Sequence, residues 1–279
     1  MTTIERELNY VGDTMDKLRY YDFFAGAGLV RLALDKHWEC VFANDIDPKK
    51  AEVYIKNFGN KEFLLDDVSN VKASILPKNA DMAWASFPCQ DLSLAGGRKG
   101  IVAERSGTFW AFWRIMMDLF DKGQRPPVIV IENVMGLLHG ENFVGLCESL
   151  AALGLQFGAL VIDAKHFLPQ SRPRVFVVAV DTRVDVSKFV ETPKHGDPWY
   201  PKAVTDAYSN LPNNLKDLWR WWKLPVYKGE RISLDSIIED EPTLVQWHSE
   251  EETNYLIQLM TEKNRKKVEQ ALKSGKRTI

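Results

Sequence analysis

The chain has 279 residues, 45% of them hydrophobic, which suits one large α/β domain or such a domain with an appended segment. Its 36 Lys and Arg against 38 Asp and Glu give a formal net charge of −2. This balance excludes a protein that coats nucleic acid indiscriminately, although it permits a local basic cleft. Three cysteines without paired spacing exclude a disulfide framework and a CxxC metal signature, so no metal is expected.

The sequence offers no membrane-spanning or secretory segment. No apolar run approaches the roughly 20 residues that a membrane span needs. The first residues, Met1-Thr-Thr-Ile-Glu5, lack the apolar stretch of a secretory signal. We therefore expect a cytoplasmic protein without a membrane partner.

From residue 18 to residue 179, short β-rich runs alternate with helical patterns. This alternation predicts a doubly wound α/β fold, with a mostly parallel sheet covered by helices on both faces. The expected strands cover residues 19–24, 40–44, 62–65, 82–87, 128–131, 157–163 and 174–180. The expected helices cover residues 30–36, 48–57, 108–120 and 143–153. Aromatic residues recur at three- and four-residue spacing in the third helix, which is typical of a core stripe.

After residue 181 the pattern changes, because six prolines interrupt it and the alternation stops. We place a domain boundary there, with residues 1–181 as the sheet domain and 182–279 as an irregular and helical extension. Residues 215–223 concentrate aromatic and basic side chains, which could stack on bases or form a helix that packs its tryptophans onto the first domain. The pattern of residues 250–273 predicts one or two helices. The Lys and Arg cluster at 263–267 is either a basic patch or the solvated face of such a helix.

One cysteine differs from the other two in its surroundings. Cys40 and Cys147 lie in apolar patterns and are expected to fill the core. Cys89 instead follows Pro88 at the end of an expected strand and opens the polar stretch 90–100. A thiol on a loop at a strand end is a candidate nucleophile.

Acidic residues lie at the ends of three successive strands, beginning with Asp22 in the first. The first strand runs into a Gly-x-Gly turn that ends at Gly28 and precedes a helix, a geometry that lets backbone approach a ligand. The next two strands end at Asn44-Asp-Ile-Asp47 and Asp66-Asp-Val68. Carboxylates at strand ends can hold ribose hydroxyls, and the third glycine of a dinucleotide fingerprint is missing. The pattern therefore favours an adenosine-containing cofactor, and S-adenosyl-L-methionine fits better than NAD.

Two later strand ends carry further candidate residues. An almost wholly apolar strand ends at Glu132, and Arg172 and Arg174 precede the last strand. Either feature alone would be explained by a helix cap or a structural ion pair. Together with Cys89 they could gather a thiol, a carboxyl and a guanidinium around one planar substrate.

These motifs resemble, in order and spacing, those of the DNA cytosine-C5 methyltransferase family. The resemblance covers residues 18–180. It rests on Asp22-Phe-Phe-Ala-Gly-Ala-Gly28, Asn44-Asp-Ile-Asp47, Asp67-Val68, Phe87-Pro-Cys-Gln-Asp-Leu-Ser93, Glu132-Asn-Val134 and Gln170-x-Arg-x-Arg174.

The resemblance implies a covalent mechanism. Cys89, as a thiolate, would add to C6 of cytosine so that C5 can take a methyl group from S-adenosyl-L-methionine, leaving S-adenosyl-L-homocysteine. Glu132 would hold N3 and the exocyclic amine, Arg174 would hold O2, and Arg172 would help to order the loop and the phosphate. Because the target cytosine must leave the duplex to reach Cys89, base flipping in double-stranded DNA is implied.

The resemblance also assigns binding residues. The expected cofactor pocket comprises Phe24, Gly26, Gly28, Asp45 on the ribose, Ile46 on the adenine, Asp67 and Val68 on the adenine edge, and Pro88. Residues 90–105 resemble the loop that closes over DNA in this family. The expected DNA contacts are Gln90, Ser93, Arg98 and Lys99.

The chain also departs from the family pattern. Leu29 stands where many relatives have a glycine, and Asp45 stands where many have Glu. The two last motifs of the family, including the segment that completes the cofactor pocket, are not recognisable between residues 181 and 279. Residues 182–279 are therefore expected to begin or connect to a target-recognition region, and a second polypeptide could supply the remaining motifs.

Three functional hypotheses follow. The first is a prokaryotic or phage-encoded DNA cytosine-C5 methyltransferase of the restriction-modification kind. The second is an RNA cytosine methyltransferase, because some relatives with the same catalytic motifs modify tRNA. The third is an inactive or partner-dependent subunit that binds DNA without catalysing transfer alone.

Overall fold

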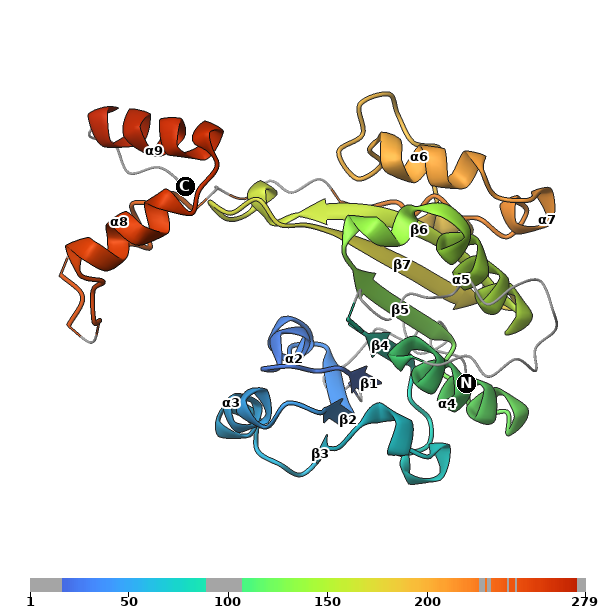
Figure 1. Cartoon of the computed structure of the whole chain (residues 1–279). Helices are drawn as coiled ribbons and strands as arrows, with labels where there is room; N and C mark the ends of the chain where they lie inside the picture. The colour runs from blue at the N-terminus through green and yellow to red at the C-terminus, as the bar shows by residue number, and fades with distance from the viewer. Residues whose placement is uncertain are drawn as a thin grey trace. The chain divides into compact units, whose positions relative to one another are not determined.

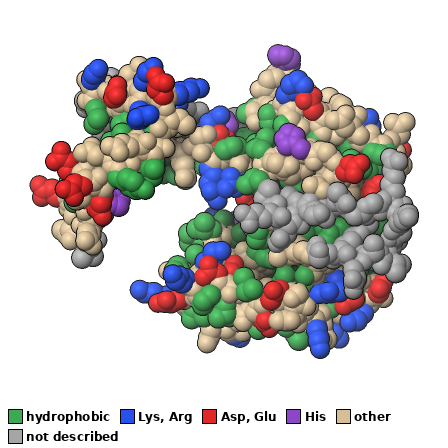
Figure 2. Space-filling view, viewed as in Figure 1, with side chains coloured by type: hydrophobic (Ala, Val, Ile, Leu, Met, Phe, Trp, Pro, Cys, Tyr) green, Lys and Arg blue, Asp and Glu red, His purple; other side chains and the backbone are tan. Residues whose placement is uncertain are grey.

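The computed structural model describes residues 17–88, 107–225, 229, 232–239, 241–243 and 245–274. These residues form two compact units. The first comprises the described residues up to Ile162 together with Pro173–Pro225, and the second comprises Asp163–Arg172 with the described residues after Pro225. On the face drawn in Figure 2, described side chains of both charge signs are visible, in keeping with the net charge of −2.

A seven-stranded sheet in the order β3-β2-β1-β4-β5-β7-β6 organises the first unit (Figure 1). Its strands are β1 (Leu18–Phe23), β2 (Trp38–Asp45), β3 (Phe63–Leu65), β4 (Met82–Ala85), β5 (Val128–Asn133), β6 (Leu155–Asp163) and β7 (Pro173–Asp181). The pairs β1–β2, β1–β4, β2–β3 and β4–β5 are parallel, and β5–β7 is antiparallel. The predicted fold class, a mostly parallel doubly wound sheet, is confirmed.

The strand order creates a switch point between β1 and β4. From β1 the chain moves to β2 and β3 on one side, and then crosses back to β4 on the other side. Because these strands are parallel, their carboxyl ends share one edge, and ligands of doubly wound folds bind at such a switch point. The residues that follow β1, β2, β3, β4 and β5 therefore meet at this edge.

Helices cover the sheet on both faces. On one face, Val30 and Leu34 of α2 (Leu29–Leu34) pack against Tyr20 and Met82. On the other face, the ring of Phe112 in α4 (Thr108–Asp121) lies 5.1 Å from that of Phe23. Tyr20 and Phe23 point to opposite faces because side chains alternate along a strand.

Local sequence explains where the other connecting helices begin. Asp47 caps α3 (Pro48–Phe58) by accepting from the amides of Lys49 and Lys50, and Pro48 suits the first helical turn. In α4, Phe109, Phe112, Trp113 and Met116 are buried, so the predicted core stripe is confirmed apart from its last member, Phe120, which is 42% exposed. Helix α5 (Gly140–Ala152) joins β5 to β6 and buries Cys147.

The segment after β7 packs against the edge strand β6. Beyond the short helices α6 (Lys202–Ser209) and α7 (Asn213–Lys216), the amide of Phe157 donates to Leu218 and the amide of Arg220 donates to Phe157, at 2.9 and 2.7 Å. A Cβ at Gly158 would lie 1.8 Å from the Arg220 oxygen, so only glycine permits this approach.

The helix predicted for residues 215–223 is therefore wrong beyond Lys216. The segment is extended because an edge strand offers unpaired backbone partners. Trp219 and Trp222 are both buried, so their rings pack against the domain and are not available to stack on bases.

β7 ends at Asp181, the residue at which the sequence analysis places its domain boundary, but the first compact unit continues to Pro225. The division at residue 181 stays a prediction.

In the second unit, the described residues include two α-helices in the range 250–274, where the sequence predicts one or two. Helix α8 (Glu250–Gln258) begins with a capping box between Ser249 and Glu252, and α9 (Glu262–Ser274) follows it. Neither helix buries a residue. Among the described residues, no helix has the length and apolar character needed to cross a membrane.

Candidate active site at the carboxyl edge of the sheet

The turn after β1 exposes backbone at the switch point. Phe24, Gly26 and Gly28 have φ values of 61°, 58° and 87°, a region that glycine adopts without strain. A Cβ at Gly28 would lie 2.5 Å from the Phe58 ring, whereas nothing lies within 4 Å of a Cβ placed on Gly26. Gly28 is thus required for packing, and Gly26 leaves room for a ligand to approach.

Asp45 fastens this turn to the end of β2. Its carboxylate accepts from the amides of Gly26 and Asp47, at 2.8 and 2.9 Å, and the residue is 6% exposed. Asp45 therefore builds the turn, and its predicted contact with a ribose stays a prediction. The neighbouring Ile46 is 63% exposed, which leaves an apolar surface beside the turn.

The end of β3 continues the same edge. Asp67 accepts from the amide of Ser69 at 2.7 Å, and this hydrogen bond holds the pKa of Asp67 below its usual range. Val68 is only 4% exposed and belongs to the core. The predicted adenine contacts of Asp67 and Val68 stay predictions.

A buried carboxyl precedes the glycine turn. Asp22 is wholly buried, and neither of its oxygens has a hydrogen-bond partner among the described residues. Burial first, and then the nearby charge of Asp45, raise the pKa of Asp22 to about 8, although Arg31 opposes the shift. Buried acids without hydrogen-bond partners are rare because desolvating the carboxyl costs free energy, so Asp22 is an unusual feature of this edge.

Glu132 and Arg174 meet on the antiparallel β5–β7 pair. Arg174 Nε lies 3.1 Å from Glu132 Oε1, with the two side chains 21% and 23% exposed. The structure thus brings together two of the predicted catalytic residues. Arg172, in contrast, belongs to the second unit, where its amide donates to Asp163.

The end of β4 lies against the glycine turn. The rings of Phe24 and Phe87 are 6.2 Å apart, and the exposed Pro88 follows directly. Cys89, Gln90, Ser93, Arg98 and Lys99 lie outside the described residues. The predicted nucleophile is therefore placed only by its position in the chain, one residue after Pro88.

Two further polar residues at this edge, both asparagines, were not predicted from the sequence to have a role. Asn44 donates from Nδ2 to the carbonyls of Leu64 and Asp66, and Asn133 donates to that of Phe87. Both stand inside recognised motifs, but only the paired backbone acceptors reveal what their side chains do.

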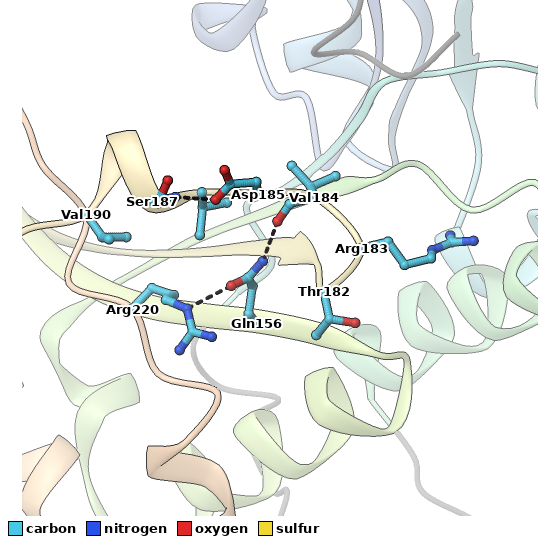
Figure 3. Close-up of a pocket in the computed structure, with 9 residues that line it drawn as sticks. Gln156, Thr182, Arg183, Val184, Asp185, Ser187, Val190 and Arg220 are labelled. Carbon is cyan, nitrogen blue, oxygen red and sulfur yellow. Dashed lines mark hydrogen bonds between the residues drawn. The ribbon is translucent and has the colours of Figure 1, made fainter.

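A cavity among the described residues lies away from this edge. It has a volume of about 410 Å³ and is lined by Gln156, Arg220 and residues 182–187, beyond the end of β7 (Figure 3). Gln156 donates to Val184 and accepts from Arg220 there. Because Val180 of β7 pairs with Val128 at the start of β5, this cavity lies at the opposite edge from Glu132. It is not part of the candidate site.

Known structures share this fold. A solved DNMT2 mutant from Spodoptera frugiperda superposes with a TM-score of 0.57 at 20% identity, over 81% of this chain and 61% of that one. At that identity the likeness shows the fold alone. The shared fold is the mostly parallel, doubly wound sheet, and in this chain the glycine turn lies at its switch point.

Residues 18–278 match the family described as C-5 cytosine-specific DNA methylase. The chain belongs to this family. It is 34% identical over 178 residues to the type II methyltransferase M.BsuFI of Bacillus subtilis. The aligned region covers 62% of this chain and 42% of that protein. The chain is 32% identical over 177 residues to M.HhaI of Haemophilus parahaemolyticus, covering 62% and 52% respectively. The chain thus spans about half the length of the curated relatives it matches.

The usual cofactor of the family is S-adenosyl-L-methionine, and the residues at this edge fit it. The space over Gly26 admits a ligand, and the exposed Ile46 offers an apolar surface for a flat ring. The buried carboxyl of Asp22 lies two residues before the turn, and a nearby cationic ligand would favour its ionised form.

Proposed function

We propose that this chain transfers a methyl group from S-adenosyl-L-methionine to C5 of a cytosine flipped out of double-stranded DNA, in keeping with its membership of the C-5 cytosine-specific DNA methylase family. The observation that carries the proposal is the ion pair between Arg174 of β7 and Glu132 of β5, the strand next to β4. β4 leads directly to Pro88 and Cys89, so a guanidinium, a carboxyl and a thiol come from neighbouring strand ends.

Each group has a defined role in this proposal. The Cys89 thiolate forms a bond to C6, which moves electron density to C5 and makes that carbon a nucleophile. The bound cofactor supplies an electrophilic methyl group. After C5 has taken the methyl group, the C5 proton leaves to a base, the C6–S bond breaks, and the thiolate is regenerated.

The side chains that face the base explain why cytosine would be chosen. Glu132, once protonated, donates to N3 and accepts from the exocyclic amine, whereas uracil presents a donor at N3 and an acceptor at O4, and Arg174 donates to O2. Because Arg174 already holds Glu132 in the free protein, the pair is set in position before a base arrives. Arg172 orders the adjoining turn and contacts a phosphate.

The proposed cofactor contacts follow the edge of the sheet. Phe24, Gly26, Gly28 and Pro88 would line the pocket, and Asp45, Ile46, Asp67 and Val68 would contact the adenosine. The proposed DNA contacts are Gln90, Ser93, Arg98 and Lys99. A second polypeptide that supplies further motifs stays a prediction.

Transfer of tritiated methyl groups to duplex DNA tests the proposal. The unaltered chain is expected to label DNA, Cys89→Ala is expected to abolish labelling while retaining cofactor binding, and Cys147→Ala, which alters a buried thiol in α5, serves as the matched control. Labelling by Cys89→Ala would rule out the covalent mechanism. Labelling of tRNA in place of DNA would support the RNA alternative, and cofactor binding without any labelling would support an inactive or partner-dependent subunit.

A further inference from the structure

We propose that two buried asparagines, Asn44 and Asn133, act as separate positioning residues: Asn44 for the cofactor half of the site and Asn133 for the catalytic half. The inference rests on the proposed function, and extends it to residues that do not touch the reacting atoms.

Asn133 joins the ends of β5 and β4. It is 4% exposed, and its Nδ2 donates to the carbonyl of Phe87 at 3.0 Å, while its Oδ1 accepts from the amide of Val134 at 2.9 Å. Phe87 lies beyond Ala85, the last residue of β4, where the ladder no longer supplies partners. The bond fixes the backbone two residues before Cys89 relative to Glu132, which adjoins Asn133.

Asn44 makes the equivalent connection between β2 and β3. It is 1% exposed, and its Nδ2 donates to the carbonyls of Leu64 and Asp66, at 3.0 and 2.9 Å. Its own carbonyl accepts from the amide of Ala25 in the glycine turn. Asn44 thus connects the end of β3 to the glycine turn. The next residue, Asp45, holds the same turn through its carboxylate, which accepts from the amide of Gly26.

The chemistry explains why asparagine stands at both positions. A carbonyl buried at a strand end needs a donor, and the primary amide supplies one without introducing a charge. An ionised aspartate of the same shape would place a negative oxygen against that carbonyl and lose the hydrogen bond. Aspartate has nearly the same shape as asparagine but, when ionised, lacks the donor. It is therefore the substitution that removes the hydrogen bond of each asparagine with the least change in size.

The two asparagines act on different strand pairs. Asn44 bridges β2 and β3, Asn133 bridges β5 and β4, and β1 lies between the two pairs in the sheet. Within the part of the chain that the structure describes, they share no hydrogen-bond partner. Independent sites have additive effects, so each substitution should impair its own half of the site and spare the other.

The test compares Asn44→Asp with Asn133→Asp in the full chain, using two readouts that need no turnover. Calorimetry with S-adenosyl-L-methionine gives the cofactor Kd, and mass spectrometry of iodoacetamide-treated protein gives the alkylation rate of Cys89. Asn44→Asp is expected to raise the cofactor Kd by about tenfold and to leave the alkylation rate within about twofold, as loss of hydrogen bonds to buried acceptors predicts. Asn133→Asp is expected to change the alkylation rate by about tenfold and to leave the Kd within about twofold.

A pH series separates positioning from a general loss of structure. Burial raises the pKa of a carboxyl introduced at position 133, and the protonated form can donate to the Phe87 carbonyl. The alkylation rate of Asn133→Asp relative to the unaltered chain should therefore recover as the pH falls. If either aspartate variant does not fold, Asn44→Ala and Asn133→Ala remove the donors without adding charge and provide the same comparison.

The inference is overturned if each variant changes both readouts by the same factor, or if neither readout changes in a folded variant. A chain that binds the cofactor and shows the split, but does not methylate DNA, would refute the proposed function and leave the positioning roles intact. A chain that does not bind the cofactor at all would contradict both.

Discussion

Two arginine–carboxylate pairs brace opposite ends of the antiparallel β5–β7 pair, and they differ in nearly every physical respect. At the start of β5, Arg125 lies 2.8 Å from Asp181, with the side chains 4% and 7% exposed. At the end of β5, Arg174 lies 3.1 Å from Glu132, with the side chains 21% and 23% exposed. The same two strands thus carry one pair that is shut away from water and one that a substrate can reach.

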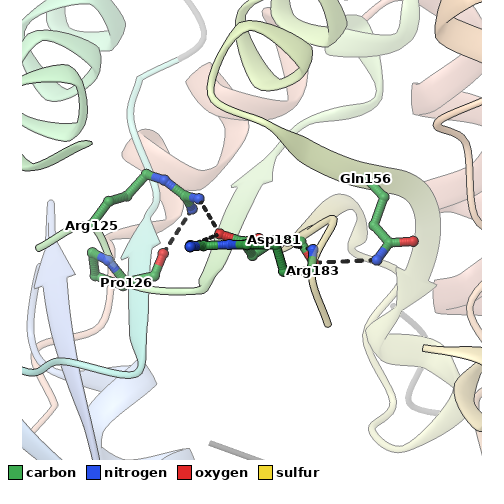
Figure 4. A network of polar contacts seen from close by, with 5 residues as sticks. All are labelled: Arg125, Pro126, Gln156, Asp181 and Arg183. Carbon is green, nitrogen blue, oxygen red and sulfur yellow. Dashed lines mark hydrogen bonds and ion pairs between the residues drawn. The ribbon is translucent and has the colours of Figure 1, made fainter. Parts of the chain in front are cut away.

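The buried pair is embedded in a network, whereas the other pair is more open. Asp181 also accepts from the backbone and guanidinium of Arg183, and the Arg125 guanidinium donates to Pro126 as well (Figure 4). The Arg183 hydrogen bond, and then the charge of Arg125, hold the pKa of Asp181 at about 2. Pairing alone therefore does not distinguish a structural pair from a functional one, but only the pair at the end of β5 is exposed enough for a ligand to reach it.

The largest expected effect is on catalysis at the open pair. Glu132→Gln keeps the size of the side chain but removes its charge and one acceptor, so methyl transfer should fall by roughly 10²–10⁴-fold. The free energy of unfolding should change by less than about 1 kcal/mol, because the pair is partly solvated. Initial rates and urea unfolding of the same preparations check both numbers. A variant that loses stability but keeps its rate would reverse the assignment of the two pairs.

A substitution in the buried pair should lower the stability of the protein without changing the rate of methyl transfer. Arg125→Ala leaves Asp181 buried beside Arg183 alone, and the expected loss is about 3 kcal/mol of unfolding free energy. The rate of methyl transfer by the folded fraction should be unchanged, because this end of the sheet lies away from the proposed site. Urea unfolding and rate measurements at low temperature test this, and a folded variant without activity would contradict it.

A third carboxyl, that of Asp22, makes the stability of the protein depend on pH in a different way from Asp181. Asp22 has its pKa raised to about 8, so between the ordinary value of 3.8 and pH 8 the folded chain holds a proton that the unfolded chain releases. Asp22 therefore makes the protein less stable as the pH rises through that window, whereas Asp181, with its lowered pKa, loses its stabilising effect only as the pH falls toward 2.

The Asp22→Asn variant isolates this contribution. Its unfolding free energy, relative to that of the unaltered chain, should increase steadily as the pH rises from about 5 to about 8. Denaturant unfolding at several pH values measures the difference. A difference that is independent of pH would show that Asp22 is ionised throughout.

The smallest effect is expected at Arg183. Its side chain is 87% exposed although it touches Asp181, so Arg183→Ala should cost no more than about 0.5 kcal/mol. Thermal unfolding of this variant beside Arg125→Ala separates the contribution of a buried partner from that of an exposed one. Equal losses would mean that burial does not distinguish them.

Much of the sheet could be predicted from the sequence, because its strands are short apolar runs bounded by polar turns. Predicted strand 128–131 became Val128–Asn133, for example, and Glu132 stands within it. The antiparallel direction of β7 and the pairing of residues 218–220 with β6 were not predictable, because they depend on contacts distant in the chain.

The candidate site also has a part that could be predicted from the sequence and a part that could not. The meeting of Glu132 and Arg174 was anticipated from their motifs, since each adjoins a strand end at one edge of a sheet. The burial of Asp45, the orphaned carboxyl of Asp22 and the bonds made by Asn44 and Asn133 were not, because a motif names a residue without saying which backbone groups surround it.

The central claim is that this chain attacks cytosine through Cys89. It is tested most directly with duplex DNA that carries 5-fluorocytosine, because fluorine cannot leave C5 as a proton does and the covalent adduct is retained. With S-adenosyl-L-methionine present, the unaltered chain should form a complex with this DNA that survives denaturing electrophoresis, and Cys89→Ala should form none. An equally stable complex with Cys89→Ala, or none with the unaltered chain although it binds both cofactor and DNA, would contradict the account.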